Sequence, residues 1–273
     1  MTVTASEKYE ALLGRLRRLE SVLVAYSGGV DSTLLAVAAR EALGDRALCV
    51  LATSETYPLS EVEAARATAA QLGLTLIEVE TNELNDPAFS SNPSDRCYYC
   101  KQELFGMLAD VAWTRGLAFV ADGNNADDAS DHRPGHRAAV ELGVVSPLQD
   151  AGFTKEDIRA ISRDLGLPTA DKPSMACLAS RFPYGDAIDG AGLTRVGAAE
   201  DAVRAMGLRQ FRVRSHGDVA RLEVEPGELE AAWVLRRALS QALRAAGFAY
   251  AALDLDGYRT GSLNETLPEE ERA

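Results

Sequence analysis

A chain of 273 residues is long enough to bury a sizeable core and to form two domains. Its apolar content of 47% and charged content of 25% are ordinary for a soluble globular protein. The formal net charge of −13 argues against a broad nucleic-acid-binding face, because a phosphate backbone is normally bound by a basic surface. An anionic small substrate is still compatible with it, if arginines and Mg²⁺ gather at one site.

No apolar run reaches the length that spans a membrane, and residues 1–8 lack the basic and apolar regions of a secretory signal. We therefore expect a cytoplasmic protein without a membrane partner. Four cysteines in such a chain favour thiol chemistry or metal ligation over disulfides.

Hydrophobic spacing predicts alternating helices and strands over the first part of the chain. The expected elements are a helix over 7–20, a strand over 21–26, a helix ending near residue 43, a strand over 47–52, a helix over 59–72, a strand over 74–79, a helix from about residue 97, a strand over 117–121 and a helix over 154–165. Residues 131–136 are expected to form a loop. This order predicts an α/β fold with a doubly wound parallel sheet that gathers ligands at the carboxyl ends of its strands.

The pattern changes near Pro168. Residues 172–185 contain too many helix and strand breakers to form one regular element. A helix over 193–206, strands over 208–214 and 218–225, a helix over 227–246 and a strand over 248–255 then indicate a second, smaller α+β domain. We expect a first domain over residues 1–167, a connecting loop over 168–190 and the second domain over 191–273.

The first predicted strand runs into a loop that suits phosphate, Ser27-Gly28-Gly29-Val30-Asp31-Ser32. Two glycines let the backbone approach a ligand closely, and the N–H groups and dipole of the following helix favour an anion. The serines add hydroxyl donors, and Asp31 can hold a metal ion that screens the phosphates. A Walker loop would carry a lysine after the glycines, and none stands here. The alternative is a tight glycine-rich turn without a ligand.

Other candidate nucleotide contacts follow later strands. Thr53 closes the second strand, and the segment 122–128 closes the strand over 117–121 with amides and carboxylates, among them Gly123, Asn125 and Asp128. An Asn- and Asp-rich turn is the alternative, since these residues prefer turns. At the carboxyl end of a strand in this fold, a nucleotide or Mg²⁺ contact is favoured. Lys101 and Lys172 are candidate phosphate contacts or solvated surface lysines.

Three cysteines carry the remaining chemistry. Cys97 and Cys100 form a C-x-x-C at a helix start, which suits a redox pair, half of a zinc site or two ligands of an iron–sulfur cluster. A second C-x-x-C is missing, which argues against a closed zinc site. Together with Cys177, three thiolates suit a 4Fe-4S cluster with one open iron that can carry sulfide. Cys177 stands in a loop rich in Pro, Ser and Arg, whereas Cys49 reads as a small buried residue of an apolar strand.

These motifs resemble known families in one order along nearly the whole chain. The loop over 27–32 resembles the signature of the PP-loop ATP pyrophosphatases, which hold the β and γ phosphates of ATP as a leaving group. The segments 123–128 and 172–185 resemble the LarE family of pyridinium-3,5-biscarboxylic acid mononucleotide sulfurtransferases. These enzymes make the organic part of the nickel-pincer cofactor of lactate racemase.

The resemblance implies a PP-loop fold of the adenine nucleotide alpha hydrolase type, with ATP, Mg²⁺ and a 4Fe-4S cluster as cofactors. It implies that the enzyme adenylylates a substrate carboxylate, releases pyrophosphate and converts the acyl group to a thiocarboxylate. One branch of the family sacrifices the cysteine matching Cys177. Having Cys97 and Cys100, this chain is similar to the other branch, which uses a cluster to deliver sulfide repeatedly. Homo-oligomers, with hexamers in the family, are implied as well, and the sulfide donor is left open.

The resemblance also implies site residues in the second half of the chain. Ser180 and Arg181, beside Cys177, would orient the phosphate or the acyl adenylate, and Glu200 matches an acidic metal or substrate contact. Arg212 and Arg214 share one face of a predicted strand, where paired guanidiniums can grip a phosphate or carboxylate. For Glu200, the alternative is an ordinary glutamate on the surface of a helix. For Arg212 and Arg214, it is a basic strand face exposed to solvent.

Two other functions compete with this one. A PP-loop tRNA thiolase also joins a C-x-x-C to ATP-driven sulfur transfer, although the acidic charge opposes tRNA binding. NAD and GMP synthetases share the first loop but need no set of three cysteines. A non-catalytic iron–sulfur or ATP sensor is the alternative from a different class, and release of pyrophosphate would distinguish an enzyme from it.

Overall fold

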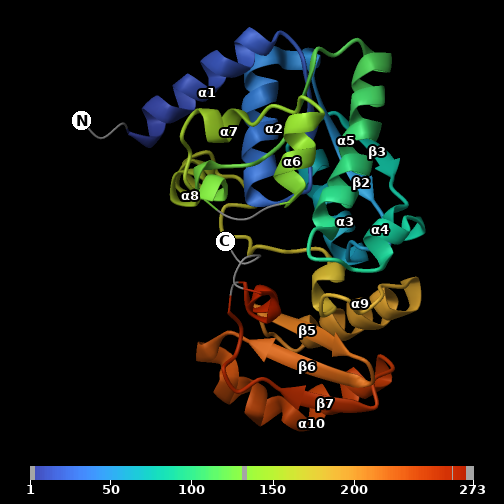
Figure 1. Ribbon diagram of the computed structural model, residues 1–273. Coiled ribbons are helices and arrows are strands. Elements are labelled where there is room, and N and C mark those ends of the chain that lie inside the picture. The colour runs from blue at the N-terminus through green and yellow to red at the C-terminus, as the bar shows by residue number, and fades with distance from the viewer. Residues whose placement is uncertain (1–3, 131–133, 260, 269–273) are drawn as a thin grey trace. The chain divides into compact units, whose positions relative to one another are not determined.

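The computed structural model describes residues 4–130, 134–259 and 261–268, and the chain forms two compact units (Figure 1). As far as the described residues go, unit 1 is built from Met1–Ser54, Leu59–Glu83 and Cys97–Ser174, and unit 2 from Glu55–Pro58, Leu84–Arg96 and Met175–Ala273. No helix among the described residues is long and apolar enough to cross a membrane.

Unit 1 contains a parallel four-stranded sheet in the order β3-β2-β1-β4. Its strands are β1 (Val22–Ala25), β2 (Ala47–Thr53), β3 (Leu76–Glu80) and β4 (Phe119–Ala121). Its longer helices are α1 (Ala5–Leu19), α2 (Val30–Leu43), α3 (Leu59–Gln71), α5 (Arg96–Arg115), α6 (Pro134–Glu141) and α8 (Lys155–Asp164), with α7 (Pro147–Asp150) as a single turn. This arrangement confirms the predicted α/β fold with a parallel sheet.

Alternation along the strands places apolar side chains on both faces of this sheet. Leu23, Val50 and Val120 lie on one face, where Phe105 and Leu108 of α5 pack against them. The opposite face carries residues such as Val24, which is fully buried, and α2 contacts β1 and β2. The sheet is therefore a buried platform, and the polar loops collect at the carboxyl ends of its strands.

One predicted loop is partly a helix. Residues 131–136 were expected to form a loop, but α6 begins at Pro134. Proline suits the first turn of a helix, where its missing N–H has no partner to lose. The buried side chains of Ala138 and Ala139 then anchor the helix, and residues 131–133 lie outside the described part.

Unit 2 contains a three-stranded mixed sheet in the order β5-β6-β7. Its strands are β5 (Phe211–His216), β6 (Val219–Val224) and β7 (Tyr250–Leu253), and its helices are α4 (Pro87–Ser90), α9 (Gly190–Ala205) and α10 (Leu229–Ala245). The β5–β6 pair is antiparallel, and the β6–β7 pair is parallel. Short 3₁₀ turns complete both units at η1 (Gly44–Arg46), η2 (Glu83–Asn85), η3 (Ala126–Ser130), η4 (Leu178–Arg181), η5 (Pro226–Glu228) and η6 (Ser262–Thr266).

The two faces of this second sheet differ in character. Phe211 and Val213 of β5 stand opposite Val224 and Leu222 of β6, and all four are buried. On the other face, β5 carries Arg212 and Arg214, whose partners across the strand pair are Glu223 and Arg221. The α+β unit therefore has an apolar face and a charged face, and the charged face is largely buried as well.

Candidate functional site

The glycine loop between β1 and α2 has little room for side chains. Gly28 has φ +69°, and a Cβ there would come within 2.5 Å of the Ala65 Cβ. Gly29 is the N-cap residue of α2 and has no side chain to cap it. The first-turn N–H groups of α2 are therefore offered to a ligand rather than to a capping side chain.

Hydrogen bonds close this loop on itself. Ser27 N–H donates to Ser32 Oγ over 3.1 Å, and the two hydroxyl oxygens are 3.0 Å apart. Ser32 is buried, and its hydroxyl also lies 3.3 Å from the carbonyl oxygen of Gly29. The serines hold the loop in a fixed curve, which preorganises its N–H groups for an anion.

The carboxylate of Asp31 is already engaged by a residue that the sequence did not point to. Lys155, the first residue of α8, places its Nζ 2.6 Å from both carboxylate oxygens of Asp31. Asn125 Nδ2 approaches the same carboxylate at 3.4 Å. Lys155 belongs to no sequence motif. Only its position directly after Thr154, the N-cap residue of α8, could have pointed to it.

The segment after β4 lies against the glycine loop. A Cβ on Gly123 would stand 3.1 Å from the Ser32 nitrogen, so the two backbones touch. Asn125 connects this segment to the loop, because its N–H donates to Asp128 Oδ2 over 3.0 Å while its side chain reaches Asp31. The structure thus brings together most of the residues expected around the nucleotide phosphates.

Asp122, at the root of this segment, is buried and hydrogen-bonded. It accepts from the Ser146 hydroxyl over 2.7 Å and from the side chain of Asn124 over 2.7 Å. Burial raises the pKa of Asp122, whereas its hydrogen bonds and the charges of Lys101 and His136 lower it. Asp122 therefore stabilises the turn through these hydrogen bonds, which is a structural role.

The remaining expected nucleotide contacts differ in whether they adjoin the glycine loop. Lys172 donates to the carbonyl oxygen of Gly28 over 3.0 Å and pairs with Glu61 at 2.9 Å. Thr53, the last residue of β2, donates its hydroxyl to the carbonyl of Val79 over 3.3 Å. Lys101 lies on α5 with its Nζ 5.2 Å from the centre of the Phe105 ring. Lys172 adjoins the glycine loop directly, and Thr53 and Lys101 show no such contact among the described residues.

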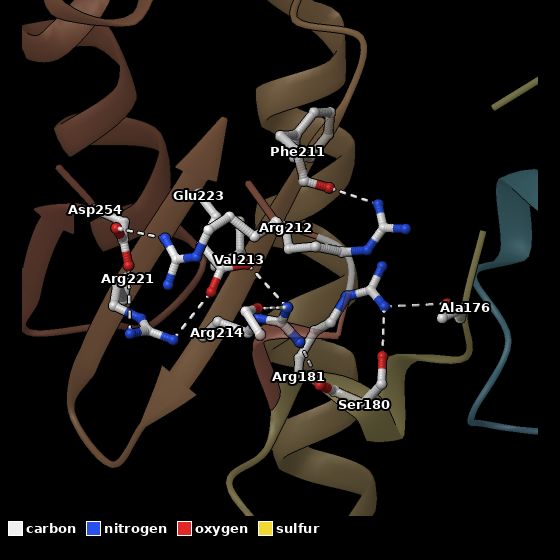
Figure 2. A network of polar contacts seen from close by, with 12 residues as sticks. Ala176, Ser180, Arg181, Phe211, Arg212, Val213, Arg214, Arg221, Glu223 and Asp254 are labelled. Atoms are coloured by element: carbon white, nitrogen blue, oxygen red, sulfur yellow. Dashed lines mark hydrogen bonds and ion pairs between the residues drawn. The ribbon is translucent and has the colours of Figure 1, made fainter. Parts of the chain in front are cut away.

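Unit 2 holds a second polar centre made of buried guanidiniums. Figure 2 shows Arg181, Arg212 and Arg214 beside one another, with Ser180 and Ala176 of the Cys177 loop at their edge. The three arginines are 0%, 5% and 6% exposed. A solvent-exposed basic strand face, the alternative for Arg212 and Arg214, is therefore excluded.

Two of these arginines are neutralised by buried carboxylates. Arg181 forms a two-pronged ion pair with Glu200, with Nε–Oε1 at 2.7 Å and Nη2–Oε2 at 2.9 Å. Arg214 pairs with Glu223 at 2.8 Å and donates to the carbonyl oxygen of Ser180 over 2.7 Å. Such paired geometry fixes the planes of both guanidiniums.

Arg212 is the third buried guanidinium of this group, and Arg181 lies next to it (Figure 2). It donates to the carbonyl oxygen of Phe211 over 2.7 Å, and its guanidinium carbon lies 5.1 Å from the centre of the Tyr258 ring. Burial, together with the nearby charge of Arg181, lowers the pKa of Arg212 to about 10. A lowered pKa means that the protein holds this positive charge at a cost in free energy, and a bound anion would offset that cost.

Comparisons with known proteins place these features in a family. A family model described as NAD synthase matches residues 14–99, which include the glycine loop. The chain is 37% identical to a pyridinium-3,5-bisthiocarboxylic acid mononucleotide synthase of Lactiplantibacillus plantarum over 97% of its own length and 96% of that protein. The chain belongs to the LarE family.

Two further relatives mark the range of this similarity. An uncharacterized protein of Synechocystis sp. is 44% identical over 95% of this chain and 98% of its own. A glutamine-hydrolyzing GMP synthase of Chlamydia caviae is 26% identical over 64% of this chain and 36% of its own. The Synechocystis protein and the synthase each match at least 95% of this chain, whereas the GMP synthase matches 64% of it.

The cysteines of this LarE-family chain lie in both units. Cys97 and Cys100 stand one helical turn apart in the first turn of α5, Cys97 exposed and Cys100 partly buried. Cys177 is partly buried and is the N-cap residue of η4 in unit 2. Cys49 is buried in β2, and burial raises the pKa of its thiol to about 12, so it takes no part in thiolate chemistry.

The donor atoms can be tested against the metals that the LarE resemblance implies. Among the described residues, no three His, Cys, Asp or Glu side chains converge to hold a metal ion. Mg²⁺ is usually bound through one or two carboxylates and the substrate's phosphates, and Asp31 and Asp128 at the glycine loop fit that requirement. Two soft thiols at one helix turn fit two ligand positions of an iron–sulfur cluster.

Sequence reasoning missed the partners that hold the arginines in place. Glu223 neutralises Arg214, and Ser262 accepts a hydrogen bond from the same guanidinium over 3.0 Å. Alternation along β6 puts Glu223 on the arginine face, so its role was within reach once the β5–β6 pairing was known. Ser262 lies in a 3₁₀ turn 48 residues after Arg214, and its local sequence does not indicate the contact.

Proposed function

We propose that this protein is an ATP-dependent sulfurtransferase that converts a carboxylate of pyridinium-3,5-biscarboxylic acid mononucleotide into a thiocarboxylate for a nickel-pincer cofactor. The observation that carries the proposal is the cluster of three buried guanidiniums around Arg212, in a chain that matches a bisthiocarboxylic acid mononucleotide synthase over nearly its full length. The substrate has a phosphate and carboxylates, which are the groups that clustered guanidiniums bind.

A carboxylate resists attack by a nucleophile, since its charge repels the nucleophile and oxide is a poor leaving group. In the first step, a carboxylate oxygen attacks the α-phosphorus of ATP, the bond to the β-phosphate breaks, and pyrophosphate leaves. The N–H groups at Gly29 and the first turn of α2 stabilise the charge on the departing pyrophosphate. Asp31 and Asp128 would hold the Mg²⁺ that shares this charge, and Lys172 adjoins the same loop.

In the second step, sulfur attacks the acyl carbon and AMP leaves with the electron pair of the acyl–oxygen bond. Arg212 and Arg214 hold the substrate phosphate, while Ser180 and Arg181 orient the reacting group beside Cys177. Glu200 keeps Arg181 in its plane, because both carboxylate oxygens accept hydrogen bonds from it. A 4Fe-4S cluster held by Cys97, Cys100 and Cys177 would supply the sulfide. We assign the nucleotide mainly to residues 1–167, the substrate phosphate to residues 191–273, and the sulfur chemistry to the Cys177 loop over 168–190 together with Cys97 and Cys100.

The decisive experiment measures pyrophosphate released from ATP and Mg²⁺ when the dicarboxylated pyridinium mononucleotide is added. We expect release that depends on this substrate and a thiocarboxylate product seen by mass spectrometry. Release that tRNA stimulates instead, or no release with the pyridinium mononucleotide, would contradict the proposal.

The Arg212→Lys variant keeps the charge but loses the planar fork, so it should weaken substrate binding far more than ATP binding. Arg236→Lys is the matched control, because Arg236 is exposed on α10, where it donates to the carbonyl oxygen of Trp233 and lies over the ring of that residue.

The cluster assignment has its own test. Protein purified without oxygen should contain iron and absorb visible light, and Cys97→Ala should remove both and stop multiple turnover. Cys49→Ala is the control, since Cys49 is buried in unit 1 and should leave the iron content unchanged. Repeated turnover by iron-free Cys97→Ala protein would refute the assignment. We further propose a homo-oligomer, with a hexamer expected from light scattering.

A further inference from the structure

Lys155 pairs with Asp31, the loop residue that we expect to hold the Mg²⁺ of ATP. It lies 124 residues after Asp31 in the sequence, yet its ammonium contacts both carboxylate oxygens at 2.6 Å. The two side chains are 39% and 24% exposed, so the pair is open to solvent and to exchange. This contact joins the start of α8 to the first turn of α2, where phosphate is expected.

The backbone of Lys155 is held firmly, independently of its side chain. Its N–H donates to Asp127 Oδ2 over 2.7 Å. Thr154 and Asp157 form a capping box at the start of α8, and Lys8 of α1 pairs with Asp157 at 2.5 Å. The backbone of Lys155 is therefore fixed at the start of α8. The ammonium can change its partner through rotation of the flexible methylene chain alone.

The glycine loop itself contains no lysine that could bind phosphate. A phosphate loop of the Walker type carries a lysine after its glycines, whereas this loop continues with Val30 and Asp31. Lys155 contacts both oxygens of Asp31, so Mg²⁺, which binds a carboxylate oxygen at about 2.1 Å, takes the place of the ammonium on at least one of them. Repulsion between the two cations then favours release of Lys155 from the carboxylate.

We propose that Lys155 is a resident counter-ion of Asp31 which Mg²⁺ displaces, and that the released ammonium then binds the terminal phosphates of the same ATP. The inference rests on the proposed function, because it assigns a task to the nucleotide site. Lys155 thereby supplies from α8 the cation that the loop itself lacks. Exchange of one cation for another keeps the carboxylate neutralised both before and after the nucleotide arrives.

The exchange predicts opposite effects of one substitution on two ligands. In Lys155→Met, Asp31 has lost its competitor, so a divalent ion without nucleotide should bind about two- to fivefold more tightly, the range expected for partly exposed ion pairs. The same variant lacks a charged phosphate donor. ATP should therefore bind about tenfold or more weakly in the presence of Mg²⁺, as expected for a hydrogen bond to a charged group.

Two binding measurements test this without turnover. Mn²⁺ replaces Mg²⁺ as the probe, and the loss of its free-ion paramagnetic resonance signal reports binding to the nucleotide-free protein. Calorimetry with α,β-methylene ATP and Mg²⁺ reports nucleotide binding, because the bond that the enzyme would cleave is blocked. Lys155→Arg keeps the positive charge, and circular dichroism verifies that each variant is folded.

Lys8→Met is the matched control. It breaks another lysine–aspartate pair at the start of α8, of similar length and exposure, but that pair does not involve Asp31. It should leave both affinities unchanged. Lys155→Arg should keep nucleotide binding close to that of the wild type.

The outcomes separate the two proposals. Tighter Mn²⁺ binding together with weaker nucleotide binding in Lys155→Met supports the exchange. Equal affinities in Lys155→Met and wild type, or changes of both in one direction, overturn it while the proposed function stands. If the wild-type protein does not bind the ATP analogue at all, the nucleotide site is wrong and both proposals fall.

Discussion

Glu200 provides the sharpest test of how the arginine centre is stabilised. Its carboxylate accepts from Arg181 Nε at 2.7 Å and from Arg181 Nη2 at 2.9 Å. It also accepts from the N–H of Val213 at 3.0 Å, an N–H on the side of β5 that faces away from β6. The Glu200 and Arg181 side chains are 2% and 0% exposed. Glu200→Gln keeps the shape and removes only the charge and one acceptor.

The expected loss follows from this burial. Removing one partner of a buried ion pair leaves the other charge uncompensated, which costs about 3–5 kcal/mol in the free energy of unfolding. Here the amide NH₂ of glutamine would also face a donor of Arg181. With a urea dependence of about 2 kcal/mol per molar, the midpoint of the unit 2 transition should fall by about 1.5–2.5 M urea.

The two tryptophans of the chain allow this transition to be observed in one unit. Trp113 lies on α5 in unit 1 and Trp233 on α10 in unit 2, and both are exposed. In a Trp113→Phe background, fluorescence during urea unfolding reports unit 2 alone. Glu265→Gln is the matched control, because Glu265 forms a similar two-pronged pair with Arg259 on the surface of the same unit.

We expect Glu265→Gln to leave the midpoint unmoved. Glu200→Met combined with Arg181→Met removes both charges, so it should lose less stability than Glu200→Gln alone, since replacing a whole buried pair by apolar groups is often close to neutral. A Glu200→Gln midpoint equal to that of the parent would refute the view that Glu200 compensates a buried charge. So would a double variant that is less stable than the single one.

Three further predictions follow from the local geometry. Gly28→Ala should abolish nucleotide binding and destabilise the fold by more than the about 1–2 kcal/mol that Gly143→Ala loses, because both have φ +69° but only Gly28 has a neighbour in the way. Equal losses in urea melts would contradict the clash. At pH 8, iodoacetamide should label Cys97 and spare Cys49 until the protein unfolds, because burial raises the pKa of Cys49 to about 12; peptide mass mapping checks this. Burial, helped by the charge of a nearby arginine, lowers the pKa of His216 below its usual 6.5, so the unfolded chain binds the proton more readily and stability should fall as pH drops through about 6.5. His216→Gln should flatten this slope in thermal melts at pH 5–7, and an unchanged slope would refute the assignment.

The first unit could be predicted from the sequence to a large extent. Its strands are short apolar runs and its helices have regular apolar spacing, so local pattern and buried face agree. The loop over 27–32 predicted an anion site because glycines, hydroxyl groups and the start of a helix occur together there. Prediction failed at Pro134, where a residue that breaks helices in their interior instead begins one.

The sequence by itself determined the fold class, the phosphate loop and the family, since each depends on short local patterns and on their order along the chain. Only the tertiary structure decided which charges meet. Lys155 reaches Asp31 across 124 positions, and Glu200 reaches Arg181 across 19. Local sequence cannot encode such pairings, because they arise when helices and strands pack. Burial then decides how strongly each pair acts, since a charge removed from water must be matched by another.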